Sequence, residues 1–327
     1  MTYYTLTVDT EEEWDWDSGY PTQPPTVENI DQLMGFQKVA DNYGGKVTYF
    51  TNHAVLADPH ACRTISRLST NPNAEIGLHI HPWNTPPLSE TSTVSPRMSF
   101  LHNARREAGI AKLDTVLDAF ESRDLSPRSF RGGRYSTCDW IQKHLHARGI
   151  IADASILPFT TWADEGAPDF RHRQPMPQRI EMGSGTHGLW EIPLTMAFTR
   201  KPWSLWHRFY ETCSQSPLRH LRMIGIAERT IVNKVWLNLE HPLGEHFERL
   251  LQALKQLDLP CINFTMHSSS LLVGGSPYSK TSAHVAKIFE RLERALSTLA
   301  SWPNFQPATI SEVAGYLEEA HHARLGN

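Results

Sequence analysis

The chain has 327 residues, of which 40% are hydrophobic and 20% charged, and its formal net charge is −4. This length suits one large α/β domain with a sizeable core, and the composition excludes a disordered chain. Because the basic residues form no block, neither nucleic acid nor an anionic membrane is an expected partner.

Strands and helices are predicted to alternate along the chain. Strands are expected at 3–8, 46–50, 75–81, 129–130, 150–156, 189–194, 234–239 and 260–266. Helices are expected at 27–42, 58–68, 98–120, 136–148, 203–222, 245–257, 281–300 and 310–323, the fourth of them capped by Ser136. This alternation predicts a parallel sheet or barrel in a single domain spanning residues 1–327.

Two polar segments interrupt this pattern. Residues 82–96 are rich in Pro, Ser and Thr and are expected to lie over the mouth of a site. Residues 160–188 lack any hydrophobic period and are long for a plain loop, so an active-site insertion is expected there.

Cysteine usage and the absence of export signals indicate a compartment. The four cysteines are widely spaced, and none forms a Cys-x-x-Cys pair. The sequence shows no signal-peptide pattern and no apolar run long enough to span a bilayer. A cytoplasmic protein without a membrane span is therefore expected, and its oligomeric state stays open.

Chemically active side chains follow the predicted strands at their carboxyl ends. In an α/β barrel, this edge carries the active site. Unrelated surface residues would not be expected to share one edge, so the pattern indicates a single functional site. The side chains concerned are Asp9, His79, His81, Arg131, Asp153, Glu240, His241 and His267.

A metal site is the first chemistry that this pattern favours. His79 and His81 lie two residues apart on a predicted strand and therefore share a face. Glu11 would complete a set of two histidines and one carboxylate, which suits a hydrolytic metal ion. The alternative is a pair of histidines that meet solvent at a strand end. The acidic residues after Glu11 (Glu12, Glu13, Asp15 and Asp17) are interpreted as a solvated loop.

Acid–base chemistry would come from three further residues. Asp9, held off the metal, could act as a general base, and a neighbouring Arg131 would keep its carboxylate ionised. Amide hydrolysis also needs an acid for the leaving amine, and His267 is the predicted acid, with His241 as its rival. Backbone N–H groups in the turn before Ser136 could face an oxyanion.

The order of these motifs resembles the polysaccharide deacetylase family (NodB homology, carbohydrate esterase family 4). The resemblance runs from Tyr3 to Leu317 and is carried by four stretches: Val8–Glu11, Glu75–Pro82, Phe130–Tyr135 and Met266–His267. It implies a distorted (β/α)7 barrel, a divalent metal and removal of acetyl from an N-acetylated sugar.

The resemblance also implies a role for each site residue. Glu11, His79 and His81 would bind the metal, Asp9 would be the base with Arg131 as its partner, and His267 would be the acid. The backbone N–H groups near Arg134 would line an oxyanion hole. Substrate contacts are expected from four residues, whose aromatic members could stack on sugar rings or simply belong to the core: Arg134, Tyr135, Trp83 and Trp14.

Three departures separate this chain from the familiar family pattern. Glu11 lies two residues after Asp9 instead of next to it, one residue separates the histidines instead of three, and Gly133 replaces a proline. The His-x-His-Pro-Trp variant resembles a cytoplasmic branch found with bacterial surface-polysaccharide genes. Zn²⁺ is the first expectation for the metal, with Co, Ni, Fe or Mn as alternatives.

Three functions are compatible with these residues. The first is a metal-dependent N-deacetylase acting on an N-acetylated sugar or glycan precursor. The second is a metal-dependent amidase or deformylase acting on a small non-sugar amide. The third is a glycan-binding protein on an inactive deacetylase scaffold.

Overall fold

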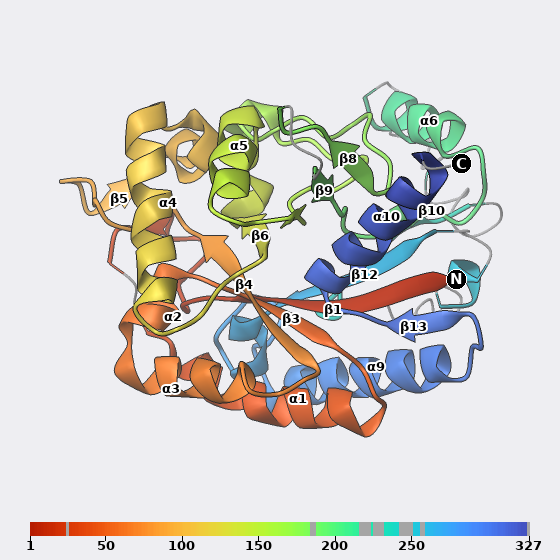
Figure 1. The fold of residues 1–327 in the computed structure, drawn as a ribbon, viewed down its shortest axis with the longest axis horizontal. Coiled ribbons are helices and arrows are strands. Elements are labelled where there is room, and N and C mark those ends of the chain that lie inside the picture. The colour runs from red at the N-terminus through yellow and green to blue at the C-terminus, as the bar shows by residue number, and fades with distance from the viewer. Residues whose placement is uncertain are drawn as a thin grey trace.

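The computed structural model describes residues 1–23, 26–183, 188–215, 224, 232–241, 251–255 and 259–325 (Figure 1). Within these ranges the chain folds into a mixed α/β structure built on one large sheet. No helix in the described ranges is both long and apolar enough to cross a membrane.

Parallel pairing organises the main sheet. Its strand order is β12-β1-β3-β4-β6-β7-β9-β8, and β13 also pairs with β1. Only the pairing of β8 with β9 is antiparallel within this sheet. The strands are β1 (Thr2–Thr10), β3 (Val47–Thr51), β4 (Ala74–Ile80), β6 (Ser129–Gly132), β7 (Ala152–Asp153), β8 (Gln178–Ile180), β9 (Leu189–Glu191), β12 (Cys261–His267) and β13 (Phe305–Pro307).

Two small antiparallel ribbons accompany this sheet. β2 (Tyr20–Pro21) pairs with β5 (Thr93–Val94), and β10 (Met196–Phe198) pairs with β11 (Lys234–Trp236). The second ribbon helps to curl the main sheet toward closure. Thr195 N–H donates to Asn263 O on β12 over 3.1 Å, and Asn238 forms a parallel bridge with Thr265. These bonds connect the end of the sheet beyond β9 back to β12.

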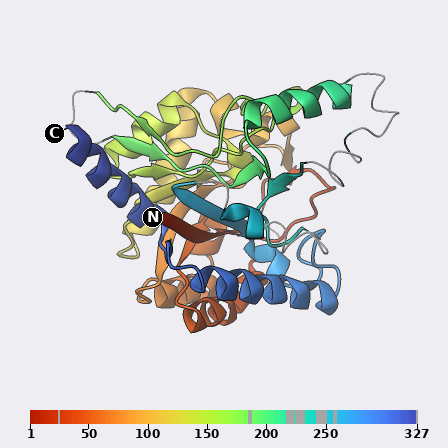
Figure 2. The same cartoon turned by 90° about the vertical axis from the view of Figure 1, so that its right-hand side faces the viewer.

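Helices pack against the outer face of this curled sheet. α1, α3 and α9 lie side by side below it in Figure 1, whereas α4 and α5 lie at the upper left. Figure 2, turned by 90°, again places α9 below the strands and shows α6 on the opposite side. The helices are α1 (Leu33–Asn42), α2 (His53–Ala57), α3 (Pro59–Leu68), α4 (Arg106–Glu121), α5 (Asp139–Ala147), α6 (Trp203–Gln215), α9 (Ser282–Ala300) and α10 (Ile310–Leu325).

Local sequence signals explain where several helices begin. Asp58 caps α3 by accepting hydrogen bonds from the N–H groups of His60 and Ala61, and Pro59 occupies the first helical position. Asn52 caps α2 by accepting from Val55 N–H over 3.2 Å. Both caps place a helix directly after or near β3, so the chain leaves the sheet edge in a fixed direction.

The predicted fold class is confirmed, but some boundaries are wrong. Ser136 does not cap α5, because the helix begins at Asp139 and the hydroxyl of Ser136 instead accepts from His102 N–H over 3.0 Å. The strand expected at 150–156 is reduced to the two residues of β7, and the helix expected from 98 begins at Arg106. The seven-fold β/α count is not confirmed, since the described main sheet has nine strands.

Parts of two predicted helices lie outside the described residues. The helix expected at 203–222 is seen as α6 up to Gln215. Of the helix expected at 245–257, residues 251–254 are helical and residues 242–250 and 256–258 are not described.

Candidate metal centre and active site

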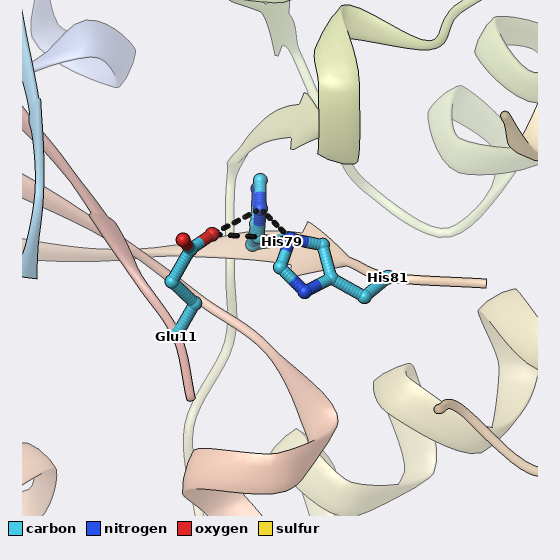
Figure 3. A group of neighbouring side chains, drawn as sticks. All are labelled: Glu11, His79 and His81. Atoms are coloured by element: carbon cyan, nitrogen blue, oxygen red, sulfur yellow. Dashed lines mark hydrogen bonds and ion pairs between the residues drawn. The ribbon is translucent and has the colours of Figure 1, made fainter. Parts of the chain in front are cut away.

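Glu11, His79 and His81 converge at the carboxyl edge of the sheet. A carboxylate oxygen of Glu11 lies 3.4 Å from Nε2 of His79 and 3.0 Å from Nε2 of His81, and the two Nε2 atoms are 3.2 Å apart. Figure 3 shows the Glu11 carboxylate pointing at both rings. All three residues are buried, and their ligand atoms lie close enough together to hold one metal ion.

Strand alternation places the two histidines together. His79 lies on β4 and His81 follows its last residue, so both side chains point to one side while Leu78 and Ile80 pack into the core. His79 is in register with Arg131 on β6, and its Nδ1 lies 2.7 Å from the Arg131 carbonyl oxygen. Because a carbonyl only accepts, Nδ1 carries the proton and Nε2 stays free for a metal.

Glu12 accepts a hydrogen bond from Nδ1 of His81 in the same way. Its carboxylate accepts from Nδ1 of His81 over 2.8 Å and from the side-chain amides of Asn52 and Asn84. Glu12 is only 1% exposed, so the interpretation of this residue as part of a solvated acidic loop is wrong. Glu13 is also buried, and its carboxylate bonds Thr26 and Asn29.

The chemistry of Glu11 fits a cation. Its second carboxylate oxygen, Oε1, is buried and has no hydrogen-bond partner among the residues that the structure describes. Burial raises the pKa of this carboxyl, but the charges of His81 and His267 and hydrogen bonds from both imidazoles outweigh burial and hold the pKa well below its usual range. Glu11 is therefore an anion with one open acceptor oxygen, beside the Nε2 atoms of His79 and His81.

Asp9 stands beside this triad and is held by Arg131. Nη1 of Arg131 donates to an Asp9 carboxylate oxygen over 2.6 Å, and Nη2 donates to Thr7 over 2.8 Å. The guanidinium is fully buried and stacks on the ring of Phe50 at 4.5 Å. A buried charge pair of this kind holds the Asp9 side chain in one orientation and balances its charge.

His267 lies across from Asp9 on the adjacent strand. β1 and β12 pair in parallel with Asp9 and His267 in register, and Nε2 of His267 is 4.0 Å from the second Asp9 oxygen. Glu240 accepts from Nδ1 of His267 over 3.0 Å. Burial lowers the pKa of His267, but the Glu240 carboxylate, followed by Glu11 and Asp9, raises it to about 10.

The rival histidine, His241, lies beside two rings of the cavity wall. Its ring contacts Trp236 and Tyr278, and it does not line the cavity above Asp9. The strand-end position of Glu240 was recognised in the sequence, but its support of His267 was not.

Asp153 is not part of the site either. Its carboxylate bonds Thr137, Gln142 and Ser155, and Ser155 in turn accepts from Gly132 N–H over 2.9 Å.

Comparison of the fold with solved structures gives the following matches. A protein named as a polysaccharide deacetylase from Mycobacterium smegmatis has a TM-score of 0.56 and 14% identity, with 98% of this chain and 91% of that chain covered. One so named from Pseudomonas aeruginosa PAO1 has a TM-score of 0.50, 14% identity and the same coverage.

The chain has the fold of the polysaccharide deacetylases. The resemblance that the motifs predicted is therefore confirmed at the level of the fold. No protein-family model matches the sequence, and a search of curated proteins found no match.

The deacetylase fold does not by itself define a reaction. A 4-alpha-glucanotransferase from Thermococcus litoralis also matches, with a TM-score of 0.51, 11% identity and coverage of 96% of this chain and 40% of that chain. Function must therefore be argued from the side chains of the site.

A cavity of about 300 Å³ lies beside Glu11, His79 and His81. Asp9, the three candidate ligands and His267 form part of its lining, together with all four residues predicted to contact substrate. Trp83 is almost fully buried, and its indole stacks on the His81 ring at 4.0 Å. Packing against a candidate ligand is thus one role of Trp83 that the structure shows.

Arg134 and Tyr135 follow Gly133 in a strained turn. Both have positive φ values, 52° and 61°, which non-glycine residues seldom adopt. The Arg134 guanidinium bonds Ser99 over 2.7 Å and the Glu165 carboxylate, so its donors serve the protein itself. Whether the turn forms an oxyanion hole stays a prediction.

Proposed function

We propose that this protein is a metal-dependent N-deacetylase that removes an acetyl group from an N-acetylated sugar or glycan precursor. The observation that carries the proposal is the pair of Asp9 and His267, in register on adjacent strands beside two histidines and a carboxylate. A base, an acid and a metal set together are the groups that hydrolysis of an amide requires.

Glu11, His79 and His81 would hold the metal through a carboxylate oxygen and two Nε2 atoms. The donor set fits Zn²⁺ first, and Co, Ni, Fe or Mn as alternatives. When bound, such an ion acts as a Lewis acid toward water and the amide carbonyl. Glu12 and the Arg131 carbonyl keep both imidazoles oriented for this task.

The protein's own residues would move the protons. Asp9 takes a proton from the attacking water while Arg131 holds its carboxylate in place. The water oxygen bonds to the acyl carbon, and the C–N bond breaks. His267 gives its proton to the departing nitrogen, so the products are acetate and a free amine. Glu240 stabilises the charged imidazole that this step needs.

The decisive experiment measures metal and acetate together. Protein loaded with Zn²⁺ is incubated with N-acetylated sugars, and acetate is assayed beside the metal content of wild type and His79→Ala. We expect acetate from the wild type only, with metal lost from the variant. A wild-type protein that binds no Zn²⁺ would refute the proposal. Unchanged acetate release by His79→Ala would also refute it.

Asp9→Asn separates the base from the ligands. We expect this variant to keep its metal and to lose turnover by about 10²–10⁴-fold, because the general base is gone while the ligand set is intact. Metal content and rate are measured on the same preparation. If metal falls together with rate, Asp9 and Glu11 have been assigned in the wrong order.

Identifying the products distinguishes sugar deacetylation from the alternative reactions. Release of formate or ammonia from small amides, without acetate from sugars, would replace the sugar deacetylase by the amidase or deformylase predicted as its alternative. Sugar binding without turnover under every metal would indicate an inactive scaffold. A cytoplasmic location stays a prediction.

A further inference from the structure

Aromatic rings line one side of the cavity in an unbroken row. Tyr20 lies 5.1 Å from Trp83, and Trp83 lies 5.7 Å from Trp14, measured between ring centroids. Trp14 lies 5.5 Å from Trp16, and Trp16 lies 5.7 Å from Tyr278. This first arc, Tyr20 to Tyr278, runs past the candidate ligand His81 and the candidate acid His267, both of which it contacts.

A second arc continues around the other side. His241 lies 5.2 Å from both Tyr278 and Trp236, and so joins the two arcs. Trp236 packs against the apolar cluster that contains Tyr135, and Tyr135 stacks with Trp162 at 6.0 Å.

An ion pair bridges the remaining gap. Arg134 pairs with Glu165, which lies three residues after Trp162, and the Arg134 guanidinium sits over Tyr20 at 4.9 Å. The side chains of the two arcs and this ion pair are together named the aromatic collar, and all of them except His241 and Glu165 line the cavity above Asp9.

The aromatic collar restricts how a sugar can reach the metal. An internal unit of a glycan is linked at both ends, so it can enter a site only along a groove that is open on two sides. A free sugar, or the last unit of a chain, can enter a ringed pit from above. Building on the proposed function, we propose that the site takes single or chain-terminal N-acylated sugars and excludes internal units.

The size and polarity of the cavity agree with this substrate class. Its volume of about 300 Å³ is at the small end of the usual range for small-molecule pockets. Its charged groups are the candidate catalytic and metal-binding residues and Arg134, whose guanidinium already bonds Ser99 and Glu165. The rest of the wall is aromatic, which suits the apolar faces of a neutral sugar ring.

The test compares a free sugar with a chain. Zn²⁺-loaded protein is given N-acetylglucosamine and its pentamer, and mass spectrometry locates each deacetylated unit. We expect acetate from the free sugar and from a terminal unit of the pentamer. Deacetylation at internal units would overturn the inference while leaving the proposed function intact.

A binding measurement keeps the inference testable if turnover is absent. The zinc-loaded Asp9→Asn protein is titrated with N-acetylglucosamine polymers of increasing length, and tryptophan fluorescence gives the number of protein molecules bound per chain. We expect this number to stay fixed as chains lengthen, because only ends bind. A number that grows with length, or no sugar binding at all, would overturn the inference.

Trp162→Ala opens the collar where it is most exposed, since this indole is 37% accessible. We expect internal deacetylation to appear, with kcat/KM for the pentamer relative to the free sugar rising at least about tenfold. Leu205→Ala, at a 57% exposed position on α6, is the control and should leave the ratio unchanged. A Trp162→Ala protein that keeps its metal and melting temperature but still modifies only terminal units would contradict the collar's role.

Discussion

At the scale of single residues, the orientation of His81 depends on Glu12. A metal-binding imidazole almost always donates its other N–H to an acceptor that orients the ring, and the buried Glu12 carboxylate is that acceptor. Asn52 and Asn84 hold Glu12 in turn, so the support reaches β3 and the loop after β4.

Glu12→Gln should therefore weaken metal binding. We expect the affinity for Zn²⁺ to fall about 10–100-fold, because a neutral amide no longer fixes the His81 ring by a charge-assisted bond. The dissociation constant is measured by competition with a chromogenic chelator at fixed pH. Glu13→Gln is the matched control, since Glu13 is also buried but bonds Thr26 and Asn29. Equal losses in the two variants would contradict this assignment.

The sequence predicted the candidate ligands but not their supports. Strand alternation was enough to pair His79 with His81, because the rule holds along the whole of β4. The same rule does not reach Glu12, since β1 ends at Thr10. Local pattern could not show that this carboxylate meets Asn52, 40 positions away.

At the scale of elements, the turn after β6 approaches β4 so closely that only glycine fits. A Cβ on Gly133 would lie 2.5 Å from the Ile80 carbonyl oxygen and 2.6 Å from Cδ2 of His81. Gly133, where the familiar deacetylase pattern has a proline, thus lies directly against a candidate ligand.

Gly133→Ala tests this contact. We expect a destabilisation of about 1–3 kcal/mol from the clash, together with weaker zinc binding, because the displaced ring is a candidate ligand. Gly315→Ala is the control in the interior of α10, where nothing lies within 4 Å of the added carbon. It should instead stabilise the protein by about 0.5–1 kcal/mol. Denaturant unfolding measures both, and a neutral Gly133→Ala would contradict the close approach.

Helix α10 is tied to the edge of the sheet by Glu318. This carboxylate accepts from Arg179 on β8 over 2.9 Å and from the Trp190 indole on β9 over 2.8 Å. Burial raises its pKa, but these hydrogen bonds outweigh burial and lower the pKa to about 2. Because the folded value lies below the ordinary 4.5, the resulting stability is present above pH 4.5 and is lost as pH falls toward 2.

Glu318→Gln should flatten this pH dependence. We expect the wild type to lose about 1–2 kcal/mol more than the variant between pH 5 and pH 3, after discounting for partial solvent exposure. Thermal unfolding across that range provides the measurement. Glu319→Gln, at the exposed neighbouring position, should behave like the wild type. Parallel curves for all three proteins would show that the tie contributes nothing measurable.

Helix and strand boundaries show what local sequence can decide. Asp58-Pro59 marked the start of α3 because its cap is formed by adjacent residues. Ser136 predicted a cap for α5, but its hydroxyl instead accepts a hydrogen bond from the N–H of the distant residue His102. The segment 160–188 contains β8, which pairs antiparallel with β9. No hydrophobic period in the sequence predicted this strand.

At the scale of the whole molecule, a bound metal would connect strands that do not touch each other. Glu11 follows β1, His79 lies on β4 with His81 directly after it, and β3 lies between these strands. Zn²⁺ should therefore stabilise the fold. At a free concentration about 100 times Kd, the expected gain is about 2.7 kcal/mol, or roughly 4 °C in melting temperature. Calorimetry with and without chelator measures it, and His79→Ala should show no such difference.

The alternation of strands and helices could be predicted from the sequence, but the closure of the sheet and the aromatic collar could not. Alternating strands and helices indicated a parallel sheet with its site at the carboxyl edge, and the structure agrees. The closure of the sheet by Thr195 and Asn238, and the collar assembled from widely separated rings, depend on contacts between distant parts of the chain. Such contacts follow from packing, which composition and periodicity do not encode.

The pairing of β1 with β12 has a consequence for biosynthesis. Asp9 and Glu11 are translated among the earliest residues here, yet Ser268, which bonds the Glu11 backbone N–H, lies 257 positions later. His267 is equally remote. The ribosome must therefore release nearly all of this sequence before the candidate acid can contact the candidate base. Until then, the edge of β1 that pairs with β12 has no partner strand.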